Sequence, residues 1–388
     1  MRSLYTILHT CSLDGWGDIE NRIFNESVWM EAQGHRILMA ASPDTPLFDR
    51  ARNHGFTVFP ISFKRRNALK VHAELRKIFQ AEQPHVLNCH SMVDARTALP
   101  AAAKSGVPCR ILSCHTSTPI QNSWYNRLVF KKWSHYVFTS APSITQEIQH
   151  RFKLKGTQIF TIPNGVDAPS QLPEKSASRK ALAKKLGLDG SSRFIGYPGW
   201  MGRERRVDVL IRAFARIQRR IPHHLILAGE APQGQREELE HLIRKLKLED
   251  RVHLMETPGD PWALYRGLDC TAMASQESQT FESIPQCLME AMYASCPVVA
   301  PETGGITDLV EHKVTGLLFG PGDADGLAEM ICRTLEHPAA ARERIHDARH
   351  QIHRLYTVSR VGRDIIRIYR LQQVWLDQKK WGRVQPLY

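Results

Sequence analysis

The sequence has 388 residues, 42% hydrophobic and 23% charged, which is typical of a soluble globular protein with two domains of ordinary size. Its formal net charge is +13, and residues 1–168 carry 20 Lys and Arg against 12 Asp and Glu. No apolar run reaches the ~18 residues of a membrane span, and residues 1–41 lack a signal-peptide pattern. The eight cysteines occur singly, so we expect reduced thiols and a cytoplasmic protein.

Short apolar runs alternate with helical stretches along the chain, which predicts parallel sheets covered by helices on both faces. Seven strands are predicted in the first half, at residues 4–9, 36–41, 57–60, 86–89, 110–114, 136–139 and 159–162. A Pro- and Ser-rich linker follows at residues 168–177, and six more strands are predicted at residues 194–198, 224–228, 252–255, 270–273, 297–300 and 316–319. The pattern indicates two doubly wound α/β domains, which bind ligands at the carboxyl ends of their strands.

Two basic segments stand out in the first half, at residues 63–70 and 124–133. Phe63 adjoins the cations of the first segment, and in the second aromatic side chains interleave with Arg and Lys, as they do at membrane interfaces. Nucleic acid would also attract this charge, but no zinc-finger, RNP-type or helix-turn-helix pattern accompanies it, so no nucleic acid is expected. An anionic membrane surface or an anionic lipid-linked acceptor is the favoured partner, and a solvated basic face is the alternative.

Two glutamates in the second half of the chain, eight residues apart, precede a predicted strand and a glycine turn. Glu282 is expected in a loop, and Glu290 eight residues later on a helix whose first turn contains Pro285. A buried strand, a tight turn at Gly304 and Gly305, and a helix from residue 307 are predicted next. Successive glycines and a helix start suit a bound phosphate.

This order resembles the Glu-x7-Glu signature of the retaining glycosyltransferases of family 4. The likeness extends through Ser275, Glu290-Ala-Met, Pro297-Val-Val, Thr315-Gly and Pro321-Gly-Asp. It implies the GT-B fold, with two Rossmann-like domains facing each other across a cleft. The expected domains are an acceptor-binding domain at residues 1–168 and a nucleotide-sugar-binding domain at residues 169–360, with a final helix, about 361–388, that packs back on the first domain.

The resemblance implies a role for each matching residue of the second domain. Glu290 would hydrogen-bond the ribose hydroxyls of a sugar nucleotide, because a carboxylate can accept from two neighbouring hydroxyls. Glu282 would face the donor sugar as a catalytic residue and stabilise the positive charge that builds as the glycosidic bond breaks. Gly304, Gly305 and Ile306 would bring backbone N–H groups to the diphosphate or the sugar.

In the first domain, Gly15, Gly17 and Glu20 partly match the family's glycine-rich loop, which contacts acceptor or phosphate; a plain turn is the alternative. His115 follows a predicted strand where the family often has a histidine that points toward the donor sugar. A hydrogen-bonded histidine at a strand end is the alternative for His115, and it is the favoured interpretation of His90.

The sequence departs from the family after residue 196, where a glycine, an arginine and, further on, a lysine are usual. Gly199 keeps the glycine position, Trp200 replaces the arginine, and Arg205 replaces the lysine that contacts the leaving diphosphate. Arg203 and Arg206 are the candidates for the missing cation. Core packing is the favoured interpretation of Trp200, and stacking on a base or sugar is the alternative.

The residues and the resemblance together predict a retaining hexosyltransferase of bacterial surface polysaccharide synthesis, such as lipopolysaccharide or capsule. Its donor would be a UDP- or GDP-sugar and its acceptor a glycan or a lipid-linked glycan. The chain lacks an Asp-x-Asp placed after a strand as in metal-dependent transferases, and it lacks a His-x3-His pair on a helix face with a third ligand. No metal and no cofactor are therefore expected. We expect a cytoplasmic protein, either free or peripheral on the inner face of the membrane. A sugar-nucleotide epimerase and a non-catalytic nucleotide-, glycan- or nucleic-acid-binding protein are the alternatives.

Overall fold

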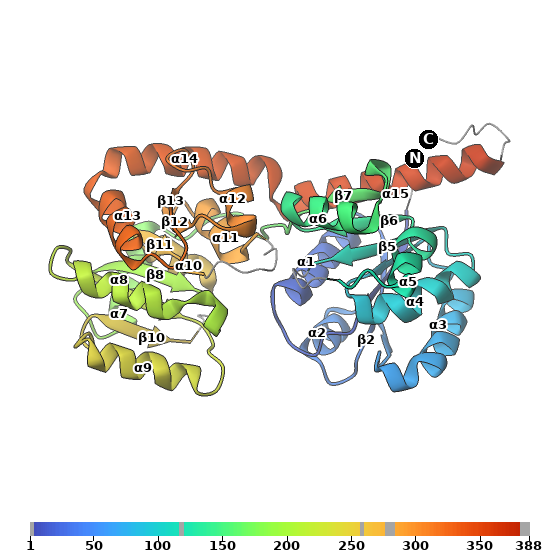
Figure 1. Cartoon of the computed structure of the whole chain (residues 1–388), viewed down its shortest axis with the longest axis horizontal. Helices are drawn as coiled ribbons and strands as arrows, with labels where there is room; N and C mark the ends of the chain where they lie inside the picture. The colour runs from blue at the N-terminus through green and yellow to red at the C-terminus, as the bar shows by residue number, and fades with distance from the viewer. Residues whose placement is uncertain (1–3, 116–119, 257–259, 276–283, 381–388) are drawn as a thin grey trace. The chain divides into compact units, whose positions relative to one another are not determined.

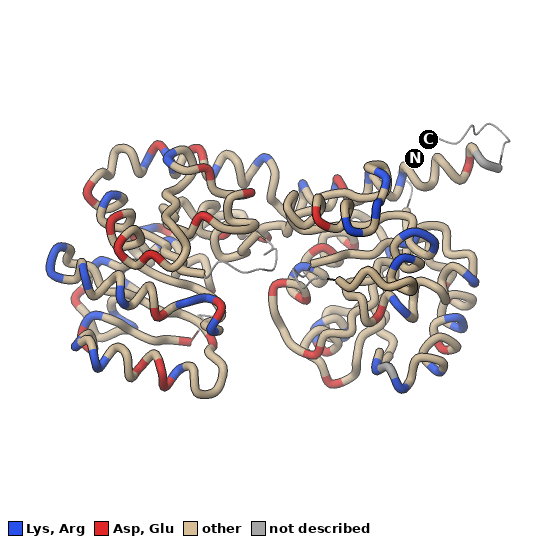
Figure 2. The backbone as a smooth tube through the Cα atoms, viewed as in Figure 1, with Lys and Arg blue, Asp and Glu red and all other residues tan. Residues whose placement is uncertain are grey.

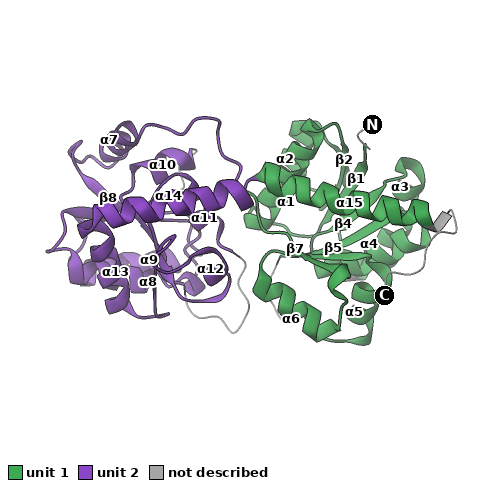
Figure 3. Ribbon diagram, turned by 90° about the horizontal axis from the view of Figure 1, so that it is seen from above, with its two compact units in different colours: residues 1–165, 358–388 green, residues 166–357 purple. Residues whose placement is uncertain are grey.

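The computed structural model describes residues 4–115, 120–256, 260–275 and 284–380 (Figure 1). The chain forms two compact units, and Lys and Arg residues occur in both of them (Figure 2). Unit 1 comprises Met1–Gly165 and Val358–Tyr388, and unit 2 comprises Val166–Thr357 (Figure 3).

Unit 1 contains a seven-stranded parallel sheet with the strand order β3-β2-β1-β4-β5-β6-β7. The strands are β1 (Thr6–Cys11), β2 (Arg36–Ala41), β3 (Thr57–Pro60), β4 (Val86–Cys89), β5 (Cys109–Cys114), β6 (Tyr136–Thr139) and β7 (Ile159–Thr161). The central strands are almost wholly buried, because helices cover both faces of a parallel sheet. The order reverses between β1 and β4, which is where doubly wound sheets bind ligands.

The helices of unit 1 begin at recognisable capping residues. Thr45 caps α2 ahead of Pro46, and the hydroxyl of Ser91 accepts from two N–H groups of α4. The helices are α1 (Asp18–Ala32), α2 (Pro46–His54), α3 (Ala68–Glu82), α4 (Met92–Lys104), α5 (Trp124–Leu128), α6 (Pro142–Phe152) and α15 (Val358–Lys380), with short turns η1 (Arg65–Asn67), η2 (Val129–Trp133) and η3 (Gly156–Gln158).

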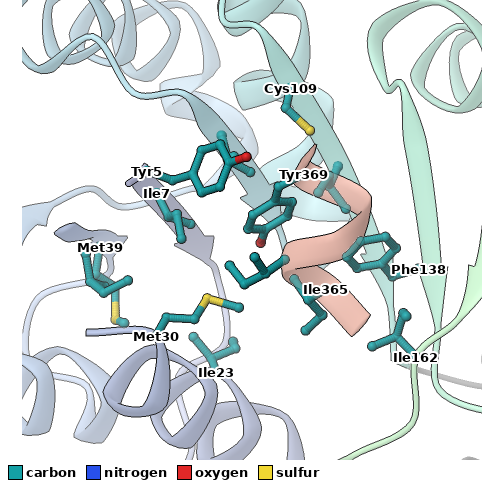
Figure 4. Packing of buried hydrophobic residues seen from close by; sticks show 14 of the residues in the cluster. Tyr5, Ile7, Ile23, Met30, Met39, Cys109, Phe138, Ile162, Ile365 and Tyr369 are labelled. Atoms are coloured by element: carbon teal, nitrogen blue, oxygen red, sulfur yellow. The ribbon is translucent and has the colours of Figure 1, made fainter. Parts of the chain in front are cut away.

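The last helix, α15, is part of the core of unit 1 although it follows unit 2 in the chain. Ile365 and Tyr369 pack with Ile7 and Phe138 in one buried cluster (Figure 4). The ring of Tyr369 meets that of Tyr5 edge to face, with 5.8 Å between centroids. Burial of such aromatic and aliphatic side chains stabilises the fold by roughly 1.5–3 kcal/mol each, so α15 is anchored firmly on the sheet of unit 1.

Unit 2 repeats this architecture with six parallel strands in the order β10-β9-β8-β11-β12-β13. They are β8 (Arg193–Pro198), β9 (His223–Ala228), β10 (Val252–Met255), β11 (Cys270–Ala272), β12 (Val298–Pro301) and β13 (Leu317–Phe319). Its helices are α7 (Lys175–Lys185), α8 (Val207–Ile217), α9 (Gln235–Lys245), α10 (Pro261–Gly267), α11 (Gln286–Tyr293), α12 (Gly304–Leu309), α13 (Ala324–Glu336) and α14 (Pro338–Leu355), with the 3-10 turn η4 (Arg203–Arg205).

The structure confirms the prediction of two doubly wound α/β domains, and each predicted strand is present with its ends shifted by two residues at most. Two local predictions are wrong. Helix α12 begins at Gly304 rather than residue 307, so the glycines form its first turn, and α7 begins at Lys175, inside the predicted linker. Among the described residues, no helix is long and apolar enough to cross a membrane.

Candidate active site

The carboxyl ends of β1, β4 and β5 bring three histidines together in unit 1. His9 lies in β1, His90 directly follows β4, and His115 directly follows β5. All three are buried. His115 also lines a cavity of about 470 Å³ with Leu13, Ile19 and residues of α4. This is the edge of the sheet at which the sequence analysis predicts a ligand.

The three histidines form one continuous hydrogen-bonded chain. The His9 Nδ1 atom lies 2.9 Å from His90 Nε2, and His90 Nδ1 lies 2.9 Å from His115 Nε2. The chain ends at Arg22, whose Nη1 atom lies 3.4 Å from His115 Nδ1. Arginine can only donate, so His115 accepts at Nδ1 and carries its proton on Nε2. The same logic places a proton on Nε2 of His90 and of His9, and Arg22 therefore sets every tautomer in the chain.

Burial keeps the three rings neutral. It lowers the pKa of His9 to about 4 and those of His90 and His115 well below the usual value, and the nearby Arg22 guanidinium lowers the latter two further. Both ring nitrogens of His115 are engaged by protein partners. His115 is thus hydrogen-bonded at a strand end, as the alternative interpretation expects for it and for His90, and it also lines the cavity. Its contact with a donor sugar stays a prediction.

Arg22 is held in place by two further partners. Its Nε atom donates to Glu26 Oε1 at 2.7 Å, four residues along α1, and its Nη1 atom donates to Asn164 Oδ1 at 3.0 Å. Both side chains of the ion pair are 2% exposed. Burial raises the pKa of Glu26, and the adjacent Arg22 opposes that rise. Sequence analysis missed Arg22, because an Arg and a Glu four residues apart are more typical of a solvated helix face.

Asp94 is a second buried group that the sequence analysis did not identify. Its carboxylate accepts from the Thr10 hydroxyl at 2.6 Å, from the His90 backbone N–H at 3.0 Å, and from the hydroxyl of Ser91. Burial raises the pKa of Asp94 to about 6, and these hydrogen bonds oppose the rise. The cluster fixes the start of α4 beside the cavity that contains His115.

The predicted glycine-rich loop forms the start of α1. Gly17 is the N-cap residue, and its N–H donates to Glu20 Oε2 at 3.0 Å, which closes the first turn. The carboxylate of Glu20 is therefore engaged by its own helix. Gly15 is exposed, with open space where a side chain would begin. Trp16 is covered by Arg50, whose guanidinium lies 3.9 Å from the ring centroid.

In unit 2, the loop after β8 presents the residues that depart from the family pattern. Gly199 has a φ of 141°, and its carbonyl approaches Gly229 so closely that a Cβ there would lie 1.8 Å away. Trp200 is 48% exposed, so the favoured interpretation of core packing is wrong. The loop backbone is held by the Tyr197 hydroxyl, which donates to the Trp200 carbonyl at 2.7 Å.

The three arginines that follow differ in their partners. Arg203 donates to Glu238 at 2.5 Å, and Arg206 makes two hydrogen bonds to Asp208, at 2.9 and 3.2 Å. Both candidates for the missing cation are thus neutralised by carboxylates. Arg205 is half-buried in the 3-10 turn η4.

Glu290 lies on α11 and is half-buried. Its Oε2 atom accepts from the Tyr265 hydroxyl at 2.9 Å and its Oε1 atom from the Gln286 amide at 3.1 Å. These contacts orient the carboxylate as an acceptor of further hydrogen bonds. Glu282, the other carboxylate of the signature, lies outside the described residues.

The glycine pair lies in unit 2 at the start of α12, with Gly304 at a φ of 47°. Gly305 and Ile306 are buried. The Ile306 N–H donates to the Thr303 carbonyl at 3.1 Å, so this backbone group is already engaged within the turn. Among the described residues, no cluster of three His, Cys, Asp or Glu side chains could hold a metal ion.

Two family profiles match the chain, and together they cover both units. The profile described as "Glycosyltransferase Family 4" matches residues 19–169, and "Glycosyl transferases group 1" matches residues 178–351. The chain belongs to the family 4 glycosyltransferases. Its two doubly wound units are those of the GT-B fold.

Known relatives of this glycosyltransferase are distant in sequence. An uncharacterized glycosyltransferase of Methanocaldococcus jannaschii is 24% identical over 61% of this chain and 60% of its own length. The N-acetyl-alpha-D-glucosaminyl L-malate synthase of Bacillus anthracis is 25% identical over 48% of each chain. The matches thus span about half of these curated relatives.

Solved glycosyltransferase structures match over nearly the whole chain. The enzyme from Rickettsia africae superimposes with a TM-score of 0.85 at 19% identity and covers 95% of this chain and 99% of its own. HepE of Anabaena, solved with UDP and glucose, has a TM-score of 0.76 at 20% identity and covers 94% and 98%. At these identities the likeness establishes the fold.

Proposed function

We propose that this glycosyltransferase moves a hexose from a nucleoside diphosphate sugar to a glycan or lipid-linked glycan, with retention of configuration, in bacterial surface polysaccharide synthesis. The observation that carries the donor assignment is the Glu290 carboxylate, fixed on α11 by Tyr265 and Gln286. HepE, which shares the fold, was solved with UDP-glucose. A uridine diphosphate sugar is therefore the first donor to test.

Each candidate residue of unit 2 has a distinct task in this proposal. Glu290 accepts hydrogen bonds from the ribose hydroxyls, and Glu282 stabilises the positive charge that develops on the donor sugar. Arg205, with the backbone of Gly304 and Gly305, neutralises the leaving diphosphate. Because these groups supply the positive charge, the reaction is proposed to need neither metal nor cofactor.

A groove in unit 1 supports an anionic, lipid-linked acceptor. It has a volume of about 610 Å³ and is lined by residues of both predicted basic segments, Ala68 and Leu69 from the first and Tyr125, Lys132 and Trp133 from the second. His72 of α3 and residues of α4 complete the lining. Segments some 60 residues apart in sequence thus share one surface. We call this surface the basic groove; it is lined by Ala68, Leu69, His72, Arg96, Thr97, Pro100, Ala103, Lys104, Tyr125, Lys132 and Trp133.

Apolar side chains next to these cations favour a membrane surface over a solvated face. Leu69 is 90% exposed, and Trp124, beside the groove residue Tyr125, is 73% exposed. Exposed Leu and Trp among Lys and Arg are typical of proteins that lie on anionic lipid. We therefore propose a cytoplasmic protein that contacts the inner membrane face through the basic groove.

The donor assignment is tested by calorimetric titration with UDP, GDP and ADP in EDTA. We expect one nucleotide to bind. Glu290→Ala should raise its Kd by about 10- to 100-fold, because hydrogen bonds to a charged group contribute ~1.5–3 kcal/mol. Glu240→Ala on α9, which removes an exposed carboxylate, is the matched control and should bind like the wild type. Binding that is equally strong in Glu290→Ala would refute the site. Binding of no nucleotide would favour a non-catalytic protein.

Product analysis separates the transferase from a sugar-nucleotide epimerase. A transferase should consume the donor faster when the lipid-linked acceptor is present, whereas an epimerase would release free nucleotide or an epimer without any acceptor. Equal consumption with and without acceptor would contradict the proposal.

The membrane assignment is tested by sedimentation with vesicles that contain about 30% phosphatidylglycerol, an anionic lipid. Leu69→Gln with Trp124→Gln should reduce the bound fraction several-fold, because both apolar anchors are lost. The control is Leu355→Gln on α14, an exposed leucine of unit 2. Equal binding of both variants would exclude the basic groove as the contact.

A further inference from the structure

A second groove of unit 1, on the side of α15, has no role in the proposed transfer reaction. It has a volume of about 460 Å³, within the range of small-molecule sites. Its lining consists of Trp29 and Gln33 at the end of α1, His35 before β2, and Arg363, Ile366, Arg367 and Arg370 of α15. We call it the α15 groove.

Three arginines give the α15 groove a strong positive charge. Positions 363, 367 and 370 are four and three residues apart, so they lie on one face of α15 over about 10 Å. Asp364 lies 3.6 Å from Arg367 but also binds Arg360 at 3.0 Å. Within the described part of the chain, Arg363 and Arg370 have no ion-pair partner. Like charges at this spacing destabilise a helix, so an anion in the groove would relieve their repulsion.

His35 contributes a neutral hydrogen-bond donor. The ring is 7% exposed, and its Nδ1 atom accepts the backbone N–H of Tyr5 at 3.1 Å. Burial, helped by the nearby Arg370 charge, lowers the pKa of His35, so the ring is neutral at pH 7. With Nδ1 accepting, the proton lies on Nε2.

Trp29 forms a rigid wall of the groove. A Cβ atom at position 362 would lie 2.2 Å from Trp29 Cε3, so the indole packs directly on the backbone of α15 and only glycine fits there. Trp29 is thereby fixed between the two helices that line the groove. An ordered aromatic wall beside three guanidinium groups suits a ligand with both a ring or carbon skeleton and an anionic group.

We propose that the α15 groove binds a soluble small molecule through its phosphate groups. Guanidinium groups match phosphate oxygens with paired hydrogen bonds, and none of the lining residues is a carboxylate that would repel them. The lining contains only two apolar side chains, Trp29 and Ile366, and neither is among the exposed large hydrophobic residues. The lining itself therefore offers no exposed apolar anchor to a lipid surface, although Leu371, which follows Arg370 in α15, is 53% exposed.

The test is calorimetric titration of the full chain with pyrophosphate in EDTA. Arg363→Gln with Arg370→Gln should raise the Kd about tenfold or more, because each substitution removes a charge-assisted hydrogen bond. Both side chains are exposed, so the variant should fold. Arg76→Gln, which removes an exposed arginine of α3, should bind like the wild type. Arg205→Gln, which weakens the proposed donor site, reports any second pyrophosphate bound there.

Three outcomes would overturn the inference. The first is that the wild type does not bind pyrophosphate, and the second is that the groove variant and Arg76→Gln bind it equally. The third is that only Arg205→Gln weakens binding, which would place the anion in the donor site. Vesicles with phosphatidic acid form a separate arm. Loss of vesicle binding in the groove variant, without any binding of pyrophosphate, would assign the groove to lipid and refute a soluble ligand.

Discussion

The two units hold the ionisable groups of their candidate sites in opposite ways. In unit 1, Arg22, Glu26 and the three histidines are buried and hydrogen-bonded to one another, and only the outer nitrogen of this chain, His9 Nε2, has no hydrogen-bond partner among the described residues. In unit 2, Arg203 and its partner Glu238 are 79% and 55% exposed, and Glu290 is half-buried. Exposed ion pairs contribute only about 0–1 kcal/mol, so the cations of unit 2 can exchange partners at little cost. Unit 1 is preorganised, whereas unit 2 keeps its charged groups available to a ligand.

The largest expected effect comes from breaking the buried ion pair of unit 1. Arg22→Gln should lower the free energy of unfolding by about 3–5 kcal/mol, because it leaves the Glu26 carboxylate buried without its cation. Chemical denaturation measures this change. Arg236→Gln is the matched control, since it removes an exposed pair of the same i,i+4 spacing in unit 2, and it should cost at most ~0.5 kcal/mol.

A second variant separates loss of charge from loss of packing. Arg22→Gln combined with Glu26→Gln should recover part of the lost stability, because no buried charge then remains unpaired. If the double variant is less stable than Arg22→Gln alone, the ion pair is not the source of the effect. Equal costs for Arg22→Gln and Arg236→Gln would remove the proposed contrast between the units.

The next effect concerns turnover in unit 2. Glu282→Gln should lower kcat by about 10²–10³, the range seen when one electrostatic contact to a transition state is removed. The Kd of the bound nucleotide should change far less, because Glu282 is proposed to face the sugar. Steady-state kinetics with the sugar nucleotide found by titration measures both. Glu302→Gln, an exposed glutamate after β12, is the control. A parallel loss of nucleotide affinity would instead assign Glu282 to nucleotide binding.

The strands were predictable from the sequence, whereas the buried network was not. Runs rich in apolar side chains mark strands directly, as at residues 36–41 and 224–228. His9 and His90 are 81 residues apart and meet only because β1 lies beside β4, and strand order is not encoded in local spacing. Trp200 illustrates the converse error, because its large apolar side chain suggested burial, whereas it is 48% exposed. Local pattern thus predicts elements, and topology determines the site.

The smallest expected effect is a pH dependence with opposite signs for two neighbours. The lowered pKa of His90 means that the unfolded chain binds a proton below pH 6.5 that the folded chain does not, so stability falls as pH falls. The pKa of Asp94, raised from 3.8 to about 6, acts in reverse, because between these values the folded chain binds the extra proton. Each group changes the slope of stability against pH by up to about 1.4 kcal/mol per pH unit.

Single variants isolate the two contributions. The free energy of unfolding is measured by denaturation between about pH 6.5 and 5.0, in steps of about half a pH unit. On acidification, His90→Asn should lose stability less steeply than the wild type. Asp94→Asn should show a steeper loss, because it removes the opposing group. His346→Asn, at an 83% exposed histidine of unit 2, should keep the wild-type slope. If His90→Asn and Asp94→Asn change the slope in the same direction, the histidine chain does not titrate as its burial requires, and the preorganisation of unit 1 must have another origin.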